Sequence, residues 1–351
     1  PPRSRAMTAS APSARAIWLL MLSSAAILAL TMGARQSLGL FIQPIVDDTS
    51  MSVVSLSFAL AIGQFVWGAV QPVFGAIADK TGSVAVVVWG GLLMAAGLGA
   101  ATMFTSDLGL TVTLGVMSAA GAGAGAFSIL IGATSRQLPP ERRAFAAGFI
   151  NAGGSFGQFV FAPLVQALIA AFGWVAAMWS MAATTLLTLP LARALGGAAL
   201  PEPAGAPAPI TLSEQIAIAL RDRSYWLLHL GFFTCGLHIA FLVTHLPGEV
   251  ALCGLPAGVS ATSLALIGLF NIAGSLTAGS LGQRMRMKTV LAAVYALRAL
   301  FIGLFLLMPR TAWTFYLFAA ALGFTWLAMD SDLSLVREGF KRNLEVARSW
   351  C

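Results

Sequence analysis

About ten apolar segments follow one another along this 351-residue chain, separated by short polar connectors. An α-helix needs roughly 20 apolar residues to cross the hydrocarbon core of a bilayer, and most of these segments reach that length. The pattern therefore predicts an all-α integral membrane protein that crosses the bilayer many times. We expect helices at residues 17–40, 54–75, 83–105, 109–134, 144–170, 174–195, 225–250, 260–282, 289–308 and 312–328.

The composition excludes a water-soluble protein and a nucleic-acid-binding one. The chain is 58% hydrophobic and 9% charged, with a mean hydropathy of +0.86. Its formal net charge is +7, but thirteen basic residues before Met329 fall in one set of alternate connectors and only Arg310 falls in the other set. This asymmetry follows the positive-inside rule. It predicts a multi-pass protein of the cell inner (plasma) membrane with a cytoplasmic N-terminus, and no nucleic-acid partner.

One long connector divides the apolar segments into two groups. Residues 200–207 are rich in Pro, Gly and Ala and cannot form a regular helix. We therefore expect a cytoplasmic N-terminal segment, a six-helix bundle, a cytoplasmic linker, an incomplete bundle of four helices and a polar tail. These parts are expected at residues 1–16, 17–195, 196–224, 225–328 and 329–351, respectively.

The hydropathy falls abruptly after Trp326, and charged residues crowd the last 23 positions. One interpretation is a genuine cytoplasmic tail. The other, which we favour, is a frameshift or truncation that replaced two further helices with polar residues. Either interpretation leaves one flank of the second bundle exposed.

A short polar motif lies between the second and third apolar segments, in the sequence Gly75-Ala-Ile-Ala-Asp79-Lys80-Thr-Gly82. A degenerate copy, Gly279-Ser-Leu-Gly-Gln-Arg284, follows a later apolar segment, so a chance polar turn is the weaker explanation. The pattern resembles the loop between the second and third helices of the major facilitator superfamily. This resemblance implies two six-helix bundles, about ten of an expected twelve helices being present here, and a loop that switches between conformations.

Residues that could carry catalysis or bind a metal are sparse. None of the thirteen acidic residues is expected at membrane depth. The three histidines, His229, His238 and His245, are spaced nine and seven residues apart rather than the three or four of a helical metal pair. The three cysteines show no metal-ligand spacing. We therefore expect no enzyme, no bound metal and no cofactor.

Arg35 and Arg298 are the charged residues that we place inside the hydrocarbon, in the first and ninth helices. A buried guanidinium keeps its proton and needs compensation from an anion or from carbonyl groups. With no carboxylate at that depth, an anionic substrate is the expected partner of Arg35, because first helices line the cavity in this fold. For Arg298 both explanations stay open.

A second resemblance is narrower. The stretch Gly33–Pro44, together with Cys235–His238 and His245–Pro247, is similar to the monocarboxylate and oxalate/formate antiporter-like branch of the superfamily. The resemblance implies transport of small organic anions. This chain departs from the branch on the eighth helix, where an arginine is common and Asn271 and Ser275 stand instead.

Polar side chains at helical spacing complete the expected binding site. Gln64, Trp67 and Gln71 share one face of the second helix, and hydrogen bonding between helices is the alternative role for such residues. His238 and His245 are candidates for proton coupling or for lining the pathway. The expected substrate-binding residues are Arg35, Gln36, Gln64, Gln71, Asn151, His238, His245, Asn271 and Arg298.

The sequence as a whole predicts a secondary active transporter that moves a mono- or dicarboxylate by alternating access, as an antiporter or a proton symporter. Its expected partners are the organic anion, the lipid bilayer, and a coupling proton or counter-anion. Two rival functions remain: an efflux transporter of other small molecules, and a truncated membrane protein that does not transport.

Overall fold

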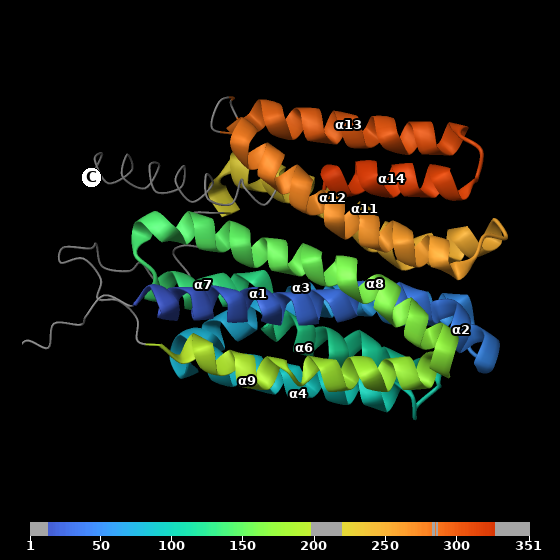
Figure 1. Ribbon diagram of the computed structural model, residues 1–351, viewed down its shortest axis with the longest axis horizontal. Coiled ribbons are helices and arrows are strands. Elements are labelled where there is room, and N and C mark those ends of the chain that lie inside the picture. Colours follow the sequence, from blue (N-terminus) through green and yellow to red (C-terminus); the bar gives the residue numbers. More distant parts are fainter. Residues whose placement is uncertain (1–12, 198–219, 283–284, 286, 327–351) are drawn as a thin grey trace, which may run out of the picture.

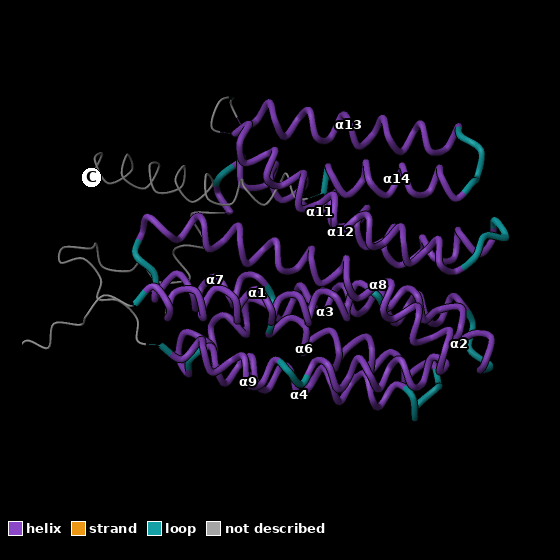
Figure 2. The backbone as a smooth tube through the Cα atoms, in the orientation of Figure 1, coloured by secondary structure: helices purple, strands orange, loops and turns teal. Residues whose placement is uncertain are grey.

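The computed structural model describes residues 13–197, 220–282, 285 and 287–326. Over these ranges the secondary structure is helical, and the helices lie side by side along the long axis of the molecule (Figures 1 and 2). The helices of the first 200 residues form one group, and α11 to α14 form a second group beside it (Figure 1). The all-α membrane fold expected from the sequence is therefore confirmed.

The first group of helices comes from the N-terminal half of the chain. Its α-helices are α1 (Ala14–Gln36), α2 (Ile42–Asp48), α3 (Val53–Thr81), α4 (Ser83–Ala101), α5 (Asp107–Leu110), α6 (Ala119–Ala124), α7 (Phe127–Gln137), α8 (Pro140–Thr185) and α9 (Thr188–Ala192). The 3₁₀ turns η1 (Leu38–Phe41) and η3 (Arg193–Gly196) and the π-helical segment η2 (Thr111–Ser118) join them. The second group contains α11 (Arg223–Leu252), α12 (Ala257–Gly282), α13 (Met287–Leu307) and α14 (Ala312–Phe324).

Hydroxyl side chains fix several of the helix starts. Ser13 and Ser52 precede α1 and α3, and each accepts a hydrogen bond from the backbone N–H three residues further on. Ser106 and Thr311 do the same at α5 and α14. Such caps satisfy donors that a helix leaves unpaired at its first turn.

Six helical segments are long and apolar enough to cross a membrane, and three shorter apolar helices accompany them. The segment Glu141–Gly196 reverses direction at Gly173, where the backbone φ of 81° suits glycine. This segment therefore contains the fifth and sixth expected helices, one on each side of Gly173. With those two helices counted separately, the structure has a helix for each of the ten expected segments.

Three local expectations need correction. The helix α3 continues through Asp79 and Lys80 to Thr81, so the polar loop expected from Gly75 shrinks to a turn at Gly82 (φ 93°). The fourth expected helix is interrupted at Gly125–Ala126, where the backbone becomes extended before α7. The first expected helix ends as an α-helix at Gln36 and continues through η1 into α2.

Small residues set how closely the helices pack. A Cβ atom on Gly157 of α8 would lie 2.1 Å from the carbonyl oxygen of Ala29 in α1, so the two backbones touch there. The same approach joins the two groups, because a Cβ on Gly268 of α12 would lie 2.6 Å from the carbonyl oxygen of Ser155. Close backbone contact of this kind replaces the hydrophobic effect as the packing force between helices in lipid.

Several expectations fall outside the described residues. These are the composition-based linker over residues 198–219, Arg284 of the second polar motif, and the polar tail over residues 329–351. Gly279 lies in α12.

Candidate functional site

A cavity of about 460 Å³ lies between the two groups of helices. Both groups supply its walls, and most of its lining is apolar. Its lining residues are Leu28, Met32, Arg35, Gln36, Leu38, Gly39, Leu60, Gly63, Gln64, Trp67, Gln71, Leu114, Ser118, Ala119, Phe127, Ser128, Asn151, Gly154, Ser155, Gly236, Ala240, Val243, Thr244, Asn271 and Trp326.

Arg35 is the charged side chain among these lining residues. Its guanidinium donates a hydrogen bond to the Oε1 atom of Gln64, and its Cζ atom lies 4.1 Å from the ring centroid of Trp67. Among the described residues, no carboxylate lies within ion-pair distance of Arg35. The guanidinium is therefore held by a neutral amide and an aromatic face, and its positive charge is not neutralised by the protein around it.

Two further polar atoms of the cavity lining are buried without a hydrogen-bond partner among the described residues. They are the Nε1 atom of Trp67, which is a donor, and the Oε1 atom of Gln36, which is an acceptor. A buried polar group without a partner costs free energy, commonly about 1–3 kcal/mol. Both atoms are enclosed by protein rather than exposed to the cavity, so a bound molecule would reach them only if the surrounding side chains moved.

Other polar residues of the lining already have partners. The side-chain amide of Gln71 donates to the carbonyl oxygen of Trp67 at 3.2 Å and accepts from the hydroxyl of Ser128 at 2.9 Å. Asn271 Nδ2 donates to Ser155 Oγ at 2.9 Å and so joins α12 to α8 across the boundary between the groups. These hydrogen bonds hold the Gln71 and Asn271 side chains in place at the cavity wall.

The structure brings six of the nine expected substrate-binding residues to this cavity: Arg35, Gln36, Gln64, Gln71, Asn151 and Asn271. His238, His245 and Arg298 are not among the lining residues. The His245 ring packs against Phe241, with 4.9 Å between ring centroids. Sequence reasoning left Ser128 and Thr244 unmarked. Ser128 lies in the first turn of α7, just after the interruption of the fourth segment, and donates to Gln71.

Arg298 is 2% exposed and lies on α13, where its guanidinium donates to the carbonyl oxygens of Thr325 and Trp326 beyond the end of α14. The last carbonyls of a helix have no partner within the helix, and a cation there also interacts favourably with the helix dipole. The carbonyl alternative that the sequence left open for Arg298 is thus the arrangement observed.

We expect Arg298→Met to lower the thermal unfolding midpoint of the purified protein, with a loss of about 2 kcal/mol of stability, because charged hydrogen bonds to the residues that follow α14 disappear. Arg298→Lys should lose less. Arg310→Met, in the connector between α13 and α14, serves as the comparison and should lower the midpoint less, because among the described residues Arg310 makes only a cation–π contact with Phe305. An unchanged midpoint for Arg298→Met would refute this stabilising role.

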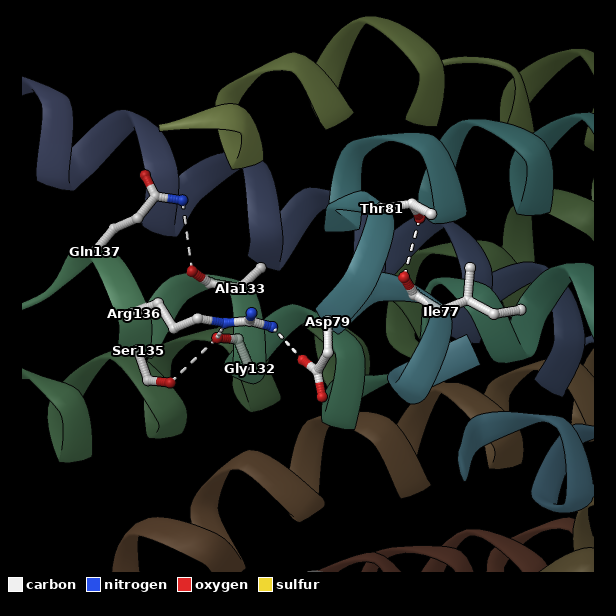
Figure 3. Close-up of polar contacts among 8 residues, drawn as sticks. All are labelled: Ile77, Asp79, Thr81, Gly132, Ala133, Ser135, Arg136 and Gln137. Atoms are coloured by element: carbon white, nitrogen blue, oxygen red, sulfur yellow. Dashed lines mark hydrogen bonds and ion pairs between the residues drawn. The ribbon is translucent and has the colours of Figure 1, made fainter. Parts of the chain in front are cut away.

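The polar motif at the end of α3 makes an ion pair with α7, a helix that is far from it in the sequence. Arg136 Nη2 of α7 lies 2.7 Å from Asp79 Oδ1, and Arg136 Nε also donates to the carbonyl of Gly132 at 3.1 Å (Figure 3). The two side chains are 44% and 69% exposed, so the pair contributes at most about 1 kcal/mol. Its neighbour Lys80 is exposed. The pair is therefore suited to adjusting a balance between conformations rather than to holding the fold.

We expect Asp79→Asn to reduce the transport rate severalfold while leaving the unfolding midpoint nearly unchanged, because a shift of about 1 kcal/mol between two conformations changes their ratio by about fivefold. Arg136→Gln should have the same effect, and the double variant should be no worse than either single one. Lys80→Gln is the matched charge control. Equal losses of transport rate in Lys80→Gln and Asp79→Asn would show that the rate depends on the charge of this region as a whole and not on the Asp79–Arg136 ion pair.

The described residues contain no group of three His, Cys, Asp or Glu side chains that could hold a metal ion. Asp47 and Asp48 lie at the end of α2, and Glu249 lies near the end of α11. None of them lines the cavity. The site thus offers one cation, several neutral hydrogen-bonding groups and a large apolar wall.

A multi-pass helical protein with a cavity between two helix groups has the architecture of a secondary transporter. The sequence profile of the Major Facilitator Superfamily matches residues 24–339, and the chain belongs to that family. It is therefore a non-enzymatic transporter-family protein.

Curated relatives point to one branch of the family. The chain is 24% identical to the oxalate:formate antiporter of Oxalobacter formigenes over 292 residues. This alignment covers 82% of this chain and 68% of the antiporter. It is 30% identical over 270 residues to monocarboxylate transporter 13 of Bos taurus, and the alignment covers 76% of this chain and 61% of that relative. It is also 30% identical over 183 residues to monocarboxylate transporter 11 of Mus musculus, with 52% of this chain and 40% of that relative covered. The chain thus spans about two fifths to two thirds of the length of these relatives.

Solved structures share the fold at low identity. A bacterial homologue of the human lysosomal transporter Spinster, in an inward-facing and occupied conformation, superposes with a TM-score of 0.67 at 15% identity, over 91% of this chain and 74% of that one. A D-xylose-proton symporter superposes with a TM-score of 0.58 at 15% identity, over 88% and 80%.

Proposed function

We propose that this protein is a secondary active transporter of small organic anions that binds its substrate in the cavity between the two helix groups. The observation that carries the proposal is Arg35, a cation in the cavity lining with no carboxylate in ion-pair distance among the described residues. A charge in such a place is costly unless an anion or dipoles compensate it. A substrate carboxylate supplies that compensation.

The geometry around Arg35 leaves its hydrogen-bonding edge available. The Cζ atom of Arg35 lies 4.1 Å from the ring centroid of Trp67, and Gln64 takes one of the five N–H donors of the guanidinium. A carboxylate binds a guanidinium edge-on, through two parallel hydrogen bonds. Arg35 is thus held in place by two neighbours on α3 while it remains able to bind an anion. The names of the curated relatives, an oxalate:formate antiporter and monocarboxylate transporters, agree with this substrate class.

Alternating access is the proposed mechanism. The cavity walls come from both helix groups, and α12 packs along α8 at the boundary between them, with close backbone approach at Gly268 and the Asn271–Ser155 hydrogen bond. Rocking of one group against the other breaks such contacts on one side of the cavity and forms others on the opposite side. A counter-anion or a proton is the proposed coupling partner.

The test is counterflow in proteoliposomes that contain the purified protein. Vesicles preloaded with unlabelled carboxylate should accumulate radiolabelled carboxylate from outside, and protein-free vesicles should not. Accumulation of labelled organic cations but not of carboxylates would overturn the proposal in favour of an efflux transporter. Failure to accumulate either would favour a membrane protein that does not transport.

We also propose that the N-terminus faces the cytoplasm, since basic residues gather in the connectors on that side. A cysteine introduced at Ser106, in the connector before α5, should react with a membrane-impermeant maleimide added to intact cells. A cysteine at Gln137, at the end of α7, should react only after permeabilisation. The opposite labelling pattern would reverse the topology.

A further inference from the structure

We infer that the neighbouring first turns of α1 and α8 form a binding site for an anionic phospholipid of the surrounding bilayer. Arg15 and Arg142 bind the phosphate of its headgroup, and the exposed rings of Trp18 and Phe145 contact the first part of an acyl chain. None of these four residues lines the cavity between the helix groups. The inference therefore goes beyond the proposed transport function and does not depend on it.

The helices α1 and α8 pack so closely that their residues keep a fixed register. A Cβ atom on Gly153 of α8 would lie 2.5 Å from the carbonyl oxygen of Ala25 in α1, and one on Gly157 would lie 2.1 Å from that of Ala29. Both pairs are 128 positions apart in the sequence, so the two helices run parallel here. Both also begin at the same end of the molecule (Figure 1).

Continued to the start of the two helices, this register brings basic residues together. Arg15 lies level with Arg143 and its neighbour Arg142, and all three are exposed. Arg143 Nε donates to the carbonyl oxygen of Leu138 at 3.1 Å. The guanidinium groups of Arg15 and Arg142 make no hydrogen bond or ion pair among the described residues. Two guanidinium groups that lie close together are thus available to an anion.

An aromatic cluster lies one helical turn further along from these arginines. Trp18 follows Arg15 by three residues, so the two share a face of α1. Phe145 follows Arg142 in the same way on α8. The rings of Trp18 and Phe145 meet edge to face with 6.3 Å between centroids, and Phe149 packs against Trp18 at 5.8 Å. Trp18 and Phe145 nevertheless remain 45% and 60% exposed, so they present an apolar wall to the lipid.

A phospholipid matches this arrangement from its phosphate to its acyl chain. Guanidinium groups bind phosphate oxygens through paired hydrogen bonds, and basic residues at a membrane surface attract anionic lipids. A tryptophan at this level donates its indole N–H to the headgroup region while its ring contacts acyl chains. A soluble phosphate would bind the arginines but leave both exposed rings without a partner.

The charge of the site favours an anionic lipid over a zwitterionic one. Glu141 is also exposed, in the first turn of α8, and opposes the attraction of an anion. The three arginines outnumber it, so the net charge of the site is positive. Removing the charge of Glu141 should therefore strengthen lipid binding, whereas removing an arginine should weaken it.

Brominated lipids test the inference, because bromine quenches tryptophan fluorescence on contact. The full chain is reconstituted in phosphatidylcholine bilayers, and brominated phosphatidylglycerol or brominated phosphatidylcholine is added in increasing amounts. The difference in quenching between the wild type and Trp18→Phe isolates the signal of Trp18. At this site phosphatidylglycerol should bind about tenfold more tightly than phosphatidylcholine, since each arginine near an anionic lipid strengthens binding by about fivefold and Glu141 offsets part of the gain.

Variants assign the lipid preference to residues. Arg15→Gln and Arg142→Gln should each lower it by about fivefold, and Arg142→Lys should lower it less because the charge stays. Glu141→Gln should raise the preference severalfold, a gain that misfolding cannot produce. Lys80→Gln is the matched control, because it removes an exposed positive charge at the end of α3, outside this site.

Two results would overturn the inference. One is equal quenching of Trp18 by the two brominated lipids. The other is a preference that survives in the double variant Arg15→Gln/Arg142→Gln, since its source would then be the charge of the protein as a whole. Soluble glycerol phosphate at millimolar concentration should not displace the brominated lipid, and displacement would assign the arginines to a soluble phosphate instead. No measurement here uses transport, so failure of the proposed function would leave this inference standing.

Discussion

Replacing Arg35 with glutamine is expected to reduce carboxylate affinity on the order of 100-fold, because it removes the cation and both hydrogen bonds of a bidentate contact. Arg35→Lys keeps the charge but loses the planar two-pronged contact, so its affinity should fall by roughly 1–3 kcal/mol. Isothermal titration of a monocarboxylate into the purified variants measures both effects. Neither variant should gain affinity for organic cations.

The control for this prediction is Arg310→Gln, which removes a positive charge that is not among the residues of the cavity lining. It should bind carboxylates as the wild type does. The unfolding midpoint of Arg35→Gln must stay near that of the wild type for the comparison to hold, and relief of an unneutralised charge makes that outcome the expected one. Equal carboxylate affinity in wild type and Arg35→Gln would assign Arg35 a structural role only.

Gly39→Ala should slow transport by at least about tenfold, because a methyl group at this cavity-lining position meets the backbone of the second helix group. A Cβ atom on Gly39 would lie 2.7 Å from the carbonyl oxygen of Val243 and 2.9 Å from that of Thr244, both in α11. These neighbours are backbone atoms that cannot rotate away, so α11 must move outward. The arrangement in which η1 touches α11 should therefore lose population. Counterflow in proteoliposomes measures the rate.

A spectroscopic measurement separates this effect from misfolding. Spin labels on Asp47, at the end of α2, and on Leu252, at the end of α11, should show a longer mean distance in Gly39→Ala than in the wild type. Gly68→Ala is the matched control, because a Cβ there meets nothing within 4 Å. Identical distance distributions in the wild type and Gly39→Ala would show that the contact does not limit the motion.

Most of the fold was predictable because a bilayer imposes strong local rules. Each expected segment corresponds to a helix of the structure, since about twenty consecutive apolar residues have no alternative stable conformation in lipid. The boundaries were less predictable. The polar residues Asp79 and Lys80 suggested a loop, yet they extend α3 by two turns, because a helix that leaves the membrane keeps its own hydrogen bonds in water.

The candidate site was predictable in part. Polar residues on the second helix, Gln64 and Gln71, do line the cavity, as helical spacing from Trp67 indicates. The histidines of α11 looked equally suitable, and the structure places neither His238 nor His245 in the lining. Spacing along a helix gives the angle between side chains, but it does not say which side faces a cavity and which faces a neighbouring helix.

Arg35 and Arg298 show which properties follow from the sequence and which depend on the tertiary structure. The sequence alone determined that both guanidinium groups need compensation, because that follows from charge and burial in an apolar helix. Only the tertiary structure decided how each is compensated. Arg298 reaches the carbonyls that follow α14, whereas Arg35 is held by Gln64 and Trp67 in a cavity wall with its charge unneutralised. The rotation of each helix about its own axis makes this difference, and contacts between segments far apart in the chain set that rotation.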